Sequence, residues 1–131
     1  MWYKCIEKRH FLESLYSEIP RLTDVRIEEI GIYDQGNQVS LKFDMPCFAD
    51  KVPSKWADSG YNTVFVHLDF FGINKISLTS YTNKIQGDIE IIRDEDGLIT
   101  ASITGAIEFS FQAECALFQK VSAYIKDDKC S

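Results

Sequence analysis

The alternation of apolar and polar residues after Pro20 is the feature that most constrains the fold of this chain. It is clearest from Val39 to Met45, where every second residue is apolar and Ser40, Lys42 and Asp44 lie between them. Because successive side chains of a strand point to opposite faces, this period of two predicts half-buried strands. Turn-forming residues recur roughly every eight to twelve residues, a spacing too short for crossover helices. The pattern therefore predicts a largely antiparallel sheet, built as a meander.

The segment before Pro20 has a helical period instead, and we predict a helix from Ile6 to Ile19 that the proline ends. Near the other terminus, Leu117–Ile125 fits both a helix and a strand, and its extended neighbours favour a strand. The predicted fold class is α+β, an N-terminal helix with a largely antiparallel sheet, and a sandwich and a half-barrel are its alternative arrangements. The length of 131 residues suits one domain, residues 1–131.

Details within the strand pattern predict its turns and one irregularity. The segments 34–37 and 94–97 are rich in aspartate, asparagine and glycine, which indicates two hairpin turns. Between residues 25 and 32 the apolar phase shifts by one at Glu28–Glu29, and this shift predicts a β-bulge. Residues 62–71 carry apolar side chains on both faces, so we expect a central strand covered on both sides, with the helix as a candidate cover.

Charge and the N-terminal residues narrow the classes of function. The formal net charge is −6, and an acidic surface repels the phosphate backbone, so we expect no binding of nucleic acid. The first ten residues carry charges where a signal peptide needs an uninterrupted apolar stretch, and no apolar run is long enough to span a membrane. We therefore expect a soluble, cytoplasmic protein that has no membrane partner.

The four cysteines predict reduced thiols. Cys5, Cys47, Cys115 and Cys130 lie far apart in the sequence and form no Cys-x-x-Cys pair. A protein that is not secreted keeps such thiols reduced, and a zinc site draws its ligands from closer pairs. The apolar surroundings of Cys47 and Cys115 predict that both are buried and inert.

The search for chemistry singles out His67 and Asp69, which share one face of a predicted strand. Two such residues can hold a metal ion or place a base beside an acid. No third ligand or nucleophile accompanies them, and no phosphate-binding glycine loop, Gly-x-Ser-x-Gly elbow or His-Glu-x-x-His helix occurs. We therefore predict a polar pair with no catalytic residue, cofactor or metal. The alternative is a small enzyme or ligand-binding domain with a pocket, between sheet and helix, that contains both residues.

Two other segments are candidate contact sites. The turn-rich segment Pro53–Asn62 carries Trp56, which is expected to pin the loop to the core, with an interface contact as the second interpretation. The acidic run Asp94, Glu95 and Asp96 is too short for a calcium loop. It is expected to be a solvated hairpin tip, and a docking patch for a cationic partner is the alternative.

Several short stretches together resemble the immunity protein 50 family of bacterial polymorphic toxin systems. The resemblance covers nearly the whole chain, although none of its motifs is catalytic. The stretches are Trp2, Pro20-Arg21-Leu22, Val39-Ser40-Leu41-Lys42-Phe43, Pro53-Ser54-Lys55-Trp56, Tyr61-Asn62, Phe109-Ser110-Phe111-Gln112-Ala113 and Ser122-Ala123-Tyr124-Ile125.

The resemblance implies a cytoplasmic, non-enzymatic protein that binds and neutralises a cognate protein toxin. It carries over no contact surface, so the residues give the candidates, which are Trp56, Tyr61, Asp94, Glu95 and Asp96. The acidic net charge suits a basic toxin as a hypothesis. An accessory subunit that assembles through an exposed sheet edge is a third possibility.

Overall fold

The computed structural model of the protein describes residues 1–80 and 82–127. Within these residues, eight strands form one sheet in the order β4-β7-β6-β5-β1-β2-β3-β8, and the paired strands are antiparallel. The strands are β1 (Leu22–Tyr33), β2 (Gln38–Asp44), β3 (Thr63–Phe71), β4 (Asn74–Ser80), β5 (Gln86–Arg93), β6 (Ile99–Gly105), β7 (Ile107–Ala113) and β8 (Cys115–Tyr124).

The predicted α+β class and antiparallel sheet are confirmed, but the predicted simple meander is wrong in two places. Strands β1 to β3 and β5 to β7 each form a meander, whereas β4 pairs with β7 and β8 pairs with β3. Strand β8 also confirms the extended interpretation of the segment 117–125 as far as Tyr124. The sheet is open, since β4 and β8 end its order.

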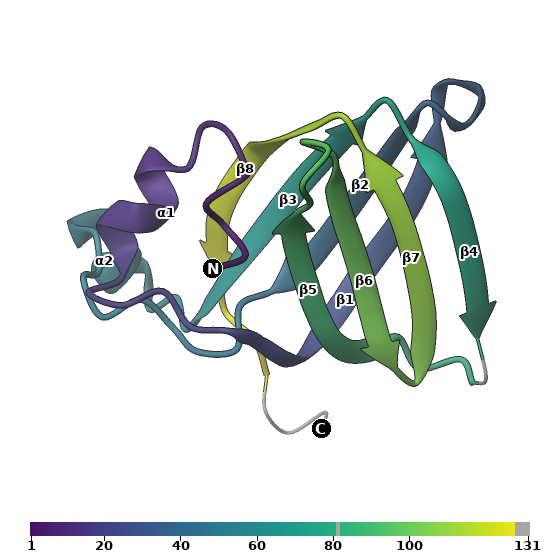
Figure 1. The fold of residues 1–131 in the computed structure, drawn as a ribbon. Helices are drawn as coiled ribbons and strands as arrows, with labels where there is room; N and C mark the ends of the chain where they lie inside the picture. The colour runs from purple at the N-terminus through teal and green to yellow at the C-terminus, as the bar shows by residue number, and fades with distance from the viewer. Residues whose placement is uncertain (81, 128–131) are drawn as a thin grey trace.

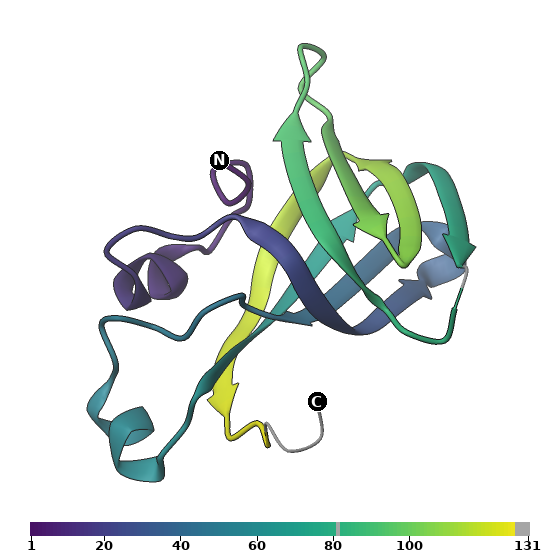
Figure 2. The same cartoon turned by 90° about the horizontal axis from the view of Figure 1, so that it is seen from below.

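Strand β1 divides the sheet into two facing layers. Its first residues pair with β5 and its later residues with β2, and the register shifts between Ile27 and Glu29. This shift confirms the bulge predicted at Glu28–Glu29. Figure 1 shows β5, β6, β7 and β4 in front of β1, β2 and β3, and Figure 2 shows the same arrangement from below. The chain thus makes an open sheet folded over at β1.

The hydrophobic core lies between these layers. The inward residues of β2 and β3 are fully buried, as the alternation predicts, and the ring of Phe70 meets that of Phe111 on β7 at 4.9 Å in an edge-to-face contact. Such aromatic pairs contribute about 1 kcal/mol beyond the burial of their area. The buried aliphatic and aromatic side chains of the two strands are Val39, Leu41, Phe43, Val64, Val66, Leu68 and Phe70.

The N-terminal helix is much shorter than predicted, because α1 spans only His10–Leu15. The backbone of Glu7 forms a bridge to the edge of β8 instead, accepting from the Phe118 N–H and donating to the Ala116 carbonyl, both at 2.9 Å. Lys8 then has a φ of 59°, outside the range of a right-handed helix. At the other end, Tyr16 is extended, so the helix ends well before Pro20.

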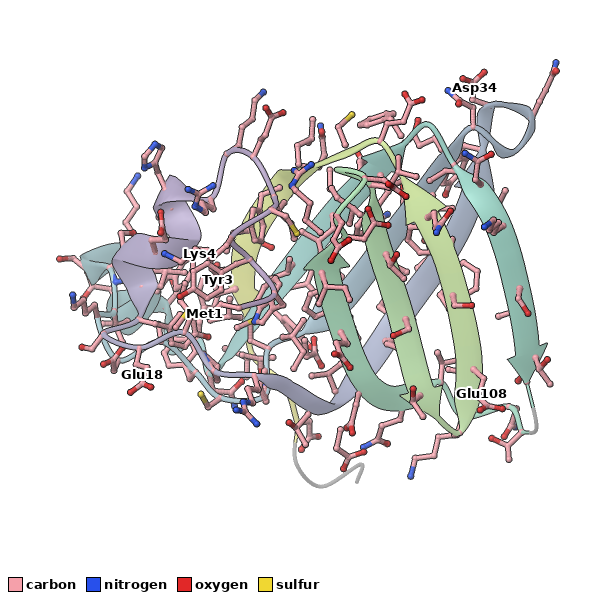
Figure 3. The ribbon with its side chains drawn as sticks, viewed as in Figure 1. Met1, Tyr3, Lys4, Glu18, Asp34 and Glu108 are labelled. Atoms are coloured by element: carbon pink, nitrogen blue, oxygen red, sulfur yellow. The ribbon has the colours of Figure 1, made fainter. Side chains whose placement is uncertain are left out.

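The first residues of the chain close the open end of the sheet. Trp2 is buried against Phe43 and Phe118, and its Nε1 donates to the Pro20 carbonyl at 3.0 Å. Figure 3 labels its neighbours Met1, Tyr3 and Lys4 between the helices and the strands. Together with α1 and α2 (Ser54–Ser59), this segment lies at one end of the two layers, as Figures 1 and 2 show.

The position of the helices leaves the outer face of β1, β2, β3 and β8 open. The expectation that β3 is covered on both sides is wrong, since Phe65, His67 and Phe71 on this face remain partly exposed. The helices pack at the end of the sheet and do not cover this face. We call it the β2–β3 outer face.

Candidate functional site

The β2–β3 outer face carries the polar side chains that strand alternation turns away from the core. On β2 these include Ser40, Lys42 and Asp44; on β3 they include His67 and Asp69. The register places Ser40 opposite Asp69 and Lys42 opposite His67. Cross-strand neighbours of this kind lie about 5 Å apart at Cβ, close enough for their side chains to bond.

The first polar network on this face surrounds Asp44, which is only 4% exposed. Its carboxylate accepts from Arg26 Nε at 2.8 Å, from the Tyr124 hydroxyl at 2.8 Å and from Lys126 Nζ at 3.3 Å. Arg26 also bonds Glu28 and the Tyr124 hydroxyl, at 2.6 and 3.2 Å. The hydrogen bond to Asp44 raises the pKa of Arg26 above its ordinary value. The buried charge is therefore fully partnered.

An open pocket of about 360 Å³ adjoins the Asp44 network. The aromatic ring of Phe65 packs edge-on against Tyr124, with centroids 6.1 Å apart. The pocket thus combines aromatic and charged walls, a mixture that is common where proteins bind one another. Its lining residues are Arg26, Glu28, Phe65, Ser122, Ala123 and Tyr124.

The second network surrounds Asp69 and confirms that His67 and Asp69 lie side by side. One oxygen of Asp69 accepts from Ser40 Oγ at 2.6 Å and lies 2.9 Å from His67 Nε2. Gln38 Nε2 donates to Ser40 Oγ at 3.3 Å. Asp69 is buried, so these bonds compensate for its loss of hydration.

A shallow pocket of about 350 Å³ lies over the Asp69 network, on the outer face of the sheet. The expected location between sheet and helix is therefore wrong, because the helices pack elsewhere. The residues that line the pocket are Tyr33, Gln38, Ser40, Lys42, His67, Asp69 and Gln119.

The bonding pattern determines what this network can do chemically. The Ser40 hydroxyl donates a hydrogen bond to Asp69, which also bonds His67. The hydroxyl therefore does not donate to the imidazole, as the hydroxyl of an activated nucleophile would. Among residues 1–80 and 82–127, no group of three metal-binding side chains is close enough to hold an ion. The spacing of His67 and Asp69 could be read from the sequence, whereas Ser40 joins them only through the strand register.

The predicted contact residue Trp56 lies on α2 and is half-buried. Its ring meets Phe11 of α1 edge-on at 5.7 Å and Phe48 at 6.3 Å. These contacts give it the geometry of a pin between α2 and α1. Tyr61, also half-buried, follows α2, and its backbone N–H donates to the Trp56 carbonyl at 3.2 Å.

The predicted acidic tip joins β5 to β6. The Asp94 carboxylate is occupied by the backbone, accepting from the N–H groups of Asp96 and Leu98 at 3.0 Å each. Glu95 and Asp96 are exposed, as expected of a hairpin tip. The tip lies apart from α2 in both ribbon views, so the structure does not bring the two candidate contact segments together.

The thiols of Cys5, Cys47 and Cys115 are free, as predicted, but the expected burial of Cys47 and Cys115 is wrong. Both are exposed, because they lie in the loop after β2 and at the start of the edge strand β8. Burial raises the pKa of Cys5, which favours its thiol form. Cys130 lies outside the described residues.

The fold and these networks define the structural class of the protein. It is an α+β protein with an open, folded-over sheet whose outer polar groups bond one another. A model of the immunity protein 50 family matches residues 8–124, and the chain belongs to this family. The match confirms the resemblance, although Trp2 precedes the matched range. No curated protein and no solved structure matches the chain. The helices found in residues 1–80 and 82–127 lack the length and apolar character needed to cross a membrane.

Proposed function

We propose that this protein neutralises a cognate protein toxin by binding it stoichiometrically and covering its active site or substrate path. The observation that carries the proposal is the family match, which spans residues 8–124 of a chain of 131. An immunity protein acts as a binding partner, so the proposed role is non-enzymatic. The proposed location is the cytoplasm, where the toxin would otherwise act on the producing cell or its siblings.

The physical properties of the fold support such a role. Both layers consist of paired strands, and the buried charges of Asp44 and Asp69 are held by bonds within the protein. A surface that is already ordered loses little conformational entropy when it binds. The net charge of −6 favours a basic toxin, whose approach it would accelerate.

The contact residues remain proposals. Glu95 and Asp96 at the exposed hairpin tip are candidates for contact with a cationic toxin, and Asp94 supports the turn that presents them. Trp56 and Tyr61 are second candidates, because the ring contacts of Trp56 favour a structural pin.

A co-expression experiment tests the proposal. The toxin encoded beside the gene for this chain is expressed in a sensitive host with and without the protein. The molar mass of the purified complex is then measured by light scattering. We expect restored growth and a complex of fixed stoichiometry. Growth arrest that persists despite soluble expression of both proteins, with no complex formed, would contradict the proposed function.

The pocket over His67 and Asp69 supports a second candidate function, the binding of a small polar ligand. Its walls offer two hydroxyls, an amine, an imidazole, a carboxylate and two amides within about 350 Å³. Native mass spectrometry of the purified protein would reveal a ligand that His67→Gln loses. His10→Gln is the matched control, since His10 is exposed on α1. Two results together would exclude this function. They are the absence of a ligand on the wild-type protein and a His67→Gln variant that neutralises the toxin as well as the wild type does.

A further inference from the structure

The net charge of this chain is confined to one part of the fold. Residues 85–114 contain seven acidic side chains and one basic one, so their formal charge equals the −6 of the whole chain. The remaining thirteen acidic side chains balance the remaining thirteen basic ones. These residues include β5, β6 and β7, which lie side by side in the front layer of Figure 1. One layer of the protein is therefore acidic, while the rest is neutral on balance.

Strand alternation places the acidic side chains of these strands on the outer surface. Asp88 and Glu90 of β5 are exposed and face Thr104 and Ser102 of β6 across the ladder. On β7, Glu108 faces outward, opposite Thr79 of the edge strand β4, and Figure 3 labels it near the start of β7. On β6 and β7 the outward residues between these acids are polar and uncharged, among them Thr100, Ser110 and Gln112. We call this surface, with the tip residues Glu95 and Asp96, the β5–β7 face.

Acidic side chains outnumber basic ones in β5, β6 and β7. The basic residue of these strands, Arg93, lies on the opposite side of β5, where it donates to the Gly97 and Cys5 carbonyls at 2.7 and 3.4 Å. On the β2–β3 outer face, by contrast, acids and bases are interspersed, as in the pair of Lys42 with Glu29. An excess of like charges on one face produces a potential that extends into solvent and attracts a cationic partner.

An exposed aliphatic residue lies within the same acidic row. Ile92 follows Asp88 and Glu90 on the outward side of β5 and is 51% exposed. It lies between the strand carboxylates and the hairpin tip. An apolar contact surrounded by polar groups is the usual composition of a protein interface, with a desolvated centre and a polar rim.

The spacing of the acids favours a broad partner over a single ion. Asp88 and Glu90 are two residues apart on one strand, about 7 Å along its axis. Asp88 Oδ1 is also engaged by the backbone N–H of Asp24 at 2.7 Å. Within the described part of the chain, these carboxylates do not converge into a group that could hold a metal. Separate charges of this kind match lysine and arginine side chains spread over a protein surface.

We propose that the β5–β7 face receives a lysine- and arginine-rich surface of the cognate toxin, with Ile92 as an apolar contact between the two acidic groups. This inference rests on the proposed function and assigns it a surface and a partner chemistry. The hydroxyl side chains between the acids are short, so little side-chain entropy is lost when a partner covers them. The charges speed association, and the exposed side of the three strands provides the contact area.

A pair of matched charge reversals tests the assignment. Glu90→Lys with Glu95→Lys alters the β5–β7 face, whereas Glu18→Lys with Asp58→Lys makes the same change in formal charge at the helical end, where Figure 3 labels Glu18. All four residues are exposed. The affinity and the association rate for the toxin encoded beside the gene are measured by surface plasmon resonance at low and high salt. We expect the face variant to lose on the order of tenfold or more in affinity, mostly in association rate, and the control to change by less than about threefold.

The outcomes separate this inference from the proposed function. Wild-type protein that neither binds nor neutralises the toxin overturns the proposed function, and this inference with it. Normal binding by the face variant overturns the assignment of the surface alone, as does an equal loss in both variants, which would reflect net charge only. Loss in the control alone also overturns it and would place the interface at the helical end. Ile92→Ser, which keeps the charge, should weaken binding through a faster dissociation rate.

Discussion

At the scale of single residues, Asp44 shows how a buried charge holds two distant parts of the chain together. It links Arg26 of β1 with Tyr124 and Lys126, which lie 98 and 100 positions further on. We predict that Asp44→Asn lowers the free energy of unfolding by about 2 kcal/mol, because the tyrosine and the guanidinium lose a charged acceptor. Equilibrium unfolding in urea measures this change.

The control for Asp44 is Glu28→Gln, which removes the other carboxylate that bonds Arg26. The side chain of Glu28 is 52% exposed, and surface ion pairs contribute about 0.5 kcal/mol or less. Equal losses in the two variants would mean that burial of Asp44 adds nothing to its interactions.

Tyr16 gives a prediction for the dependence of stability on pH. Its hydroxyl donates to the Cys47 carbonyl at 2.7 Å, and burial raises its pKa above the ordinary value. The folded state therefore favours the neutral phenol, so this stabilisation is complete below about pH 10 and is lost as pH rises above it. Tyr16→Phe should cost about 1 kcal/mol at neutral pH.

The measurement for Tyr16 is the difference in unfolding free energy between wild type and Tyr16→Phe from neutral to alkaline pH. The difference should stay constant up to about pH 9 and then shrink, because only the wild type has an unfolded state that ionises at this position. A difference that grows with pH would contradict the direction of the shift.

Residue spacing predicted part of the candidate site, and strand register supplied the rest. The interval from His67 to Asp69 places both side chains on one face of any strand, and the structure has them 2.9 Å apart. Ser40 completes the network only because β2 pairs with β3 in one particular register. Register depends on turn geometry and core packing together, so a single sequence leaves this partner open.

At the scale of elements, the ring of Trp56 connects α2 to neighbouring segments. Trp56 contacts Phe11 and Phe48, which belong to two other segments of the helical end. We predict that Trp56→Ala lowers the free energy of unfolding by about 1–2 kcal/mol, less than for a fully buried aromatic residue, and that Trp56→Phe recovers part of it. Hydrogen exchange of the α2 amides should become faster in Trp56→Ala than in Trp56→Phe.

Toxin binding decides between the two interpretations of Trp56. A structural pin leaves the affinity of the folded Trp56→Ala protein for toxin unchanged within about twofold. A large loss of affinity with no change in stability would assign the side chain to the interface instead.

The strands were more predictable than the N-terminal helix for a physical reason. Alternation from Val39 to Phe43 fixes which side chains enter the core, whatever partners the strand finds. The segment 6–19 has helical spacing, but the backbone of Glu7 bonds to β8 and the hydroxyl of Tyr16 bonds to the Cys47 carbonyl. These long-range bonds outweigh the helical propensity at both ends of a segment that is short for a stable helix.

At the scale of the whole molecule, the two layers have different electrostatic character. Acids and bases are interspersed on the β2–β3 outer face, whereas the β5–β7 face holds the acidic excess. The sequence shows the excess between residues 85 and 114, but only the order β5-β6-β7 places Asp88, Glu90 and Glu108 on one surface. The open sheet therefore presents two chemically distinct faces to a partner.

The concentration of charge on one face has a measurable consequence for stability. Like charges on adjacent strands repel, and salt screens this repulsion as the Debye length falls from about 20 Å to about 4 Å between roughly 20 mM and 500 mM sodium chloride. We predict that this increase raises the Tm of the wild type by about 2 °C, and that Glu90→Lys with Glu95→Lys loses most of the effect. Calorimetry in the two salt concentrations measures it.

The matched variant Glu18→Lys with Asp58→Lys separates the location of the charge from its amount. If the repulsion arises on the β5–β7 face, this control keeps most of the rise in Tm with salt, although its net charge changes as much as that of the face variant. The same face should then bind a cationic partner more tightly at low salt, because the partner relieves repulsion that the free protein retains. Equal loss of the salt effect in both double variants would mean that only total charge matters, and the face would have no special electrostatic role.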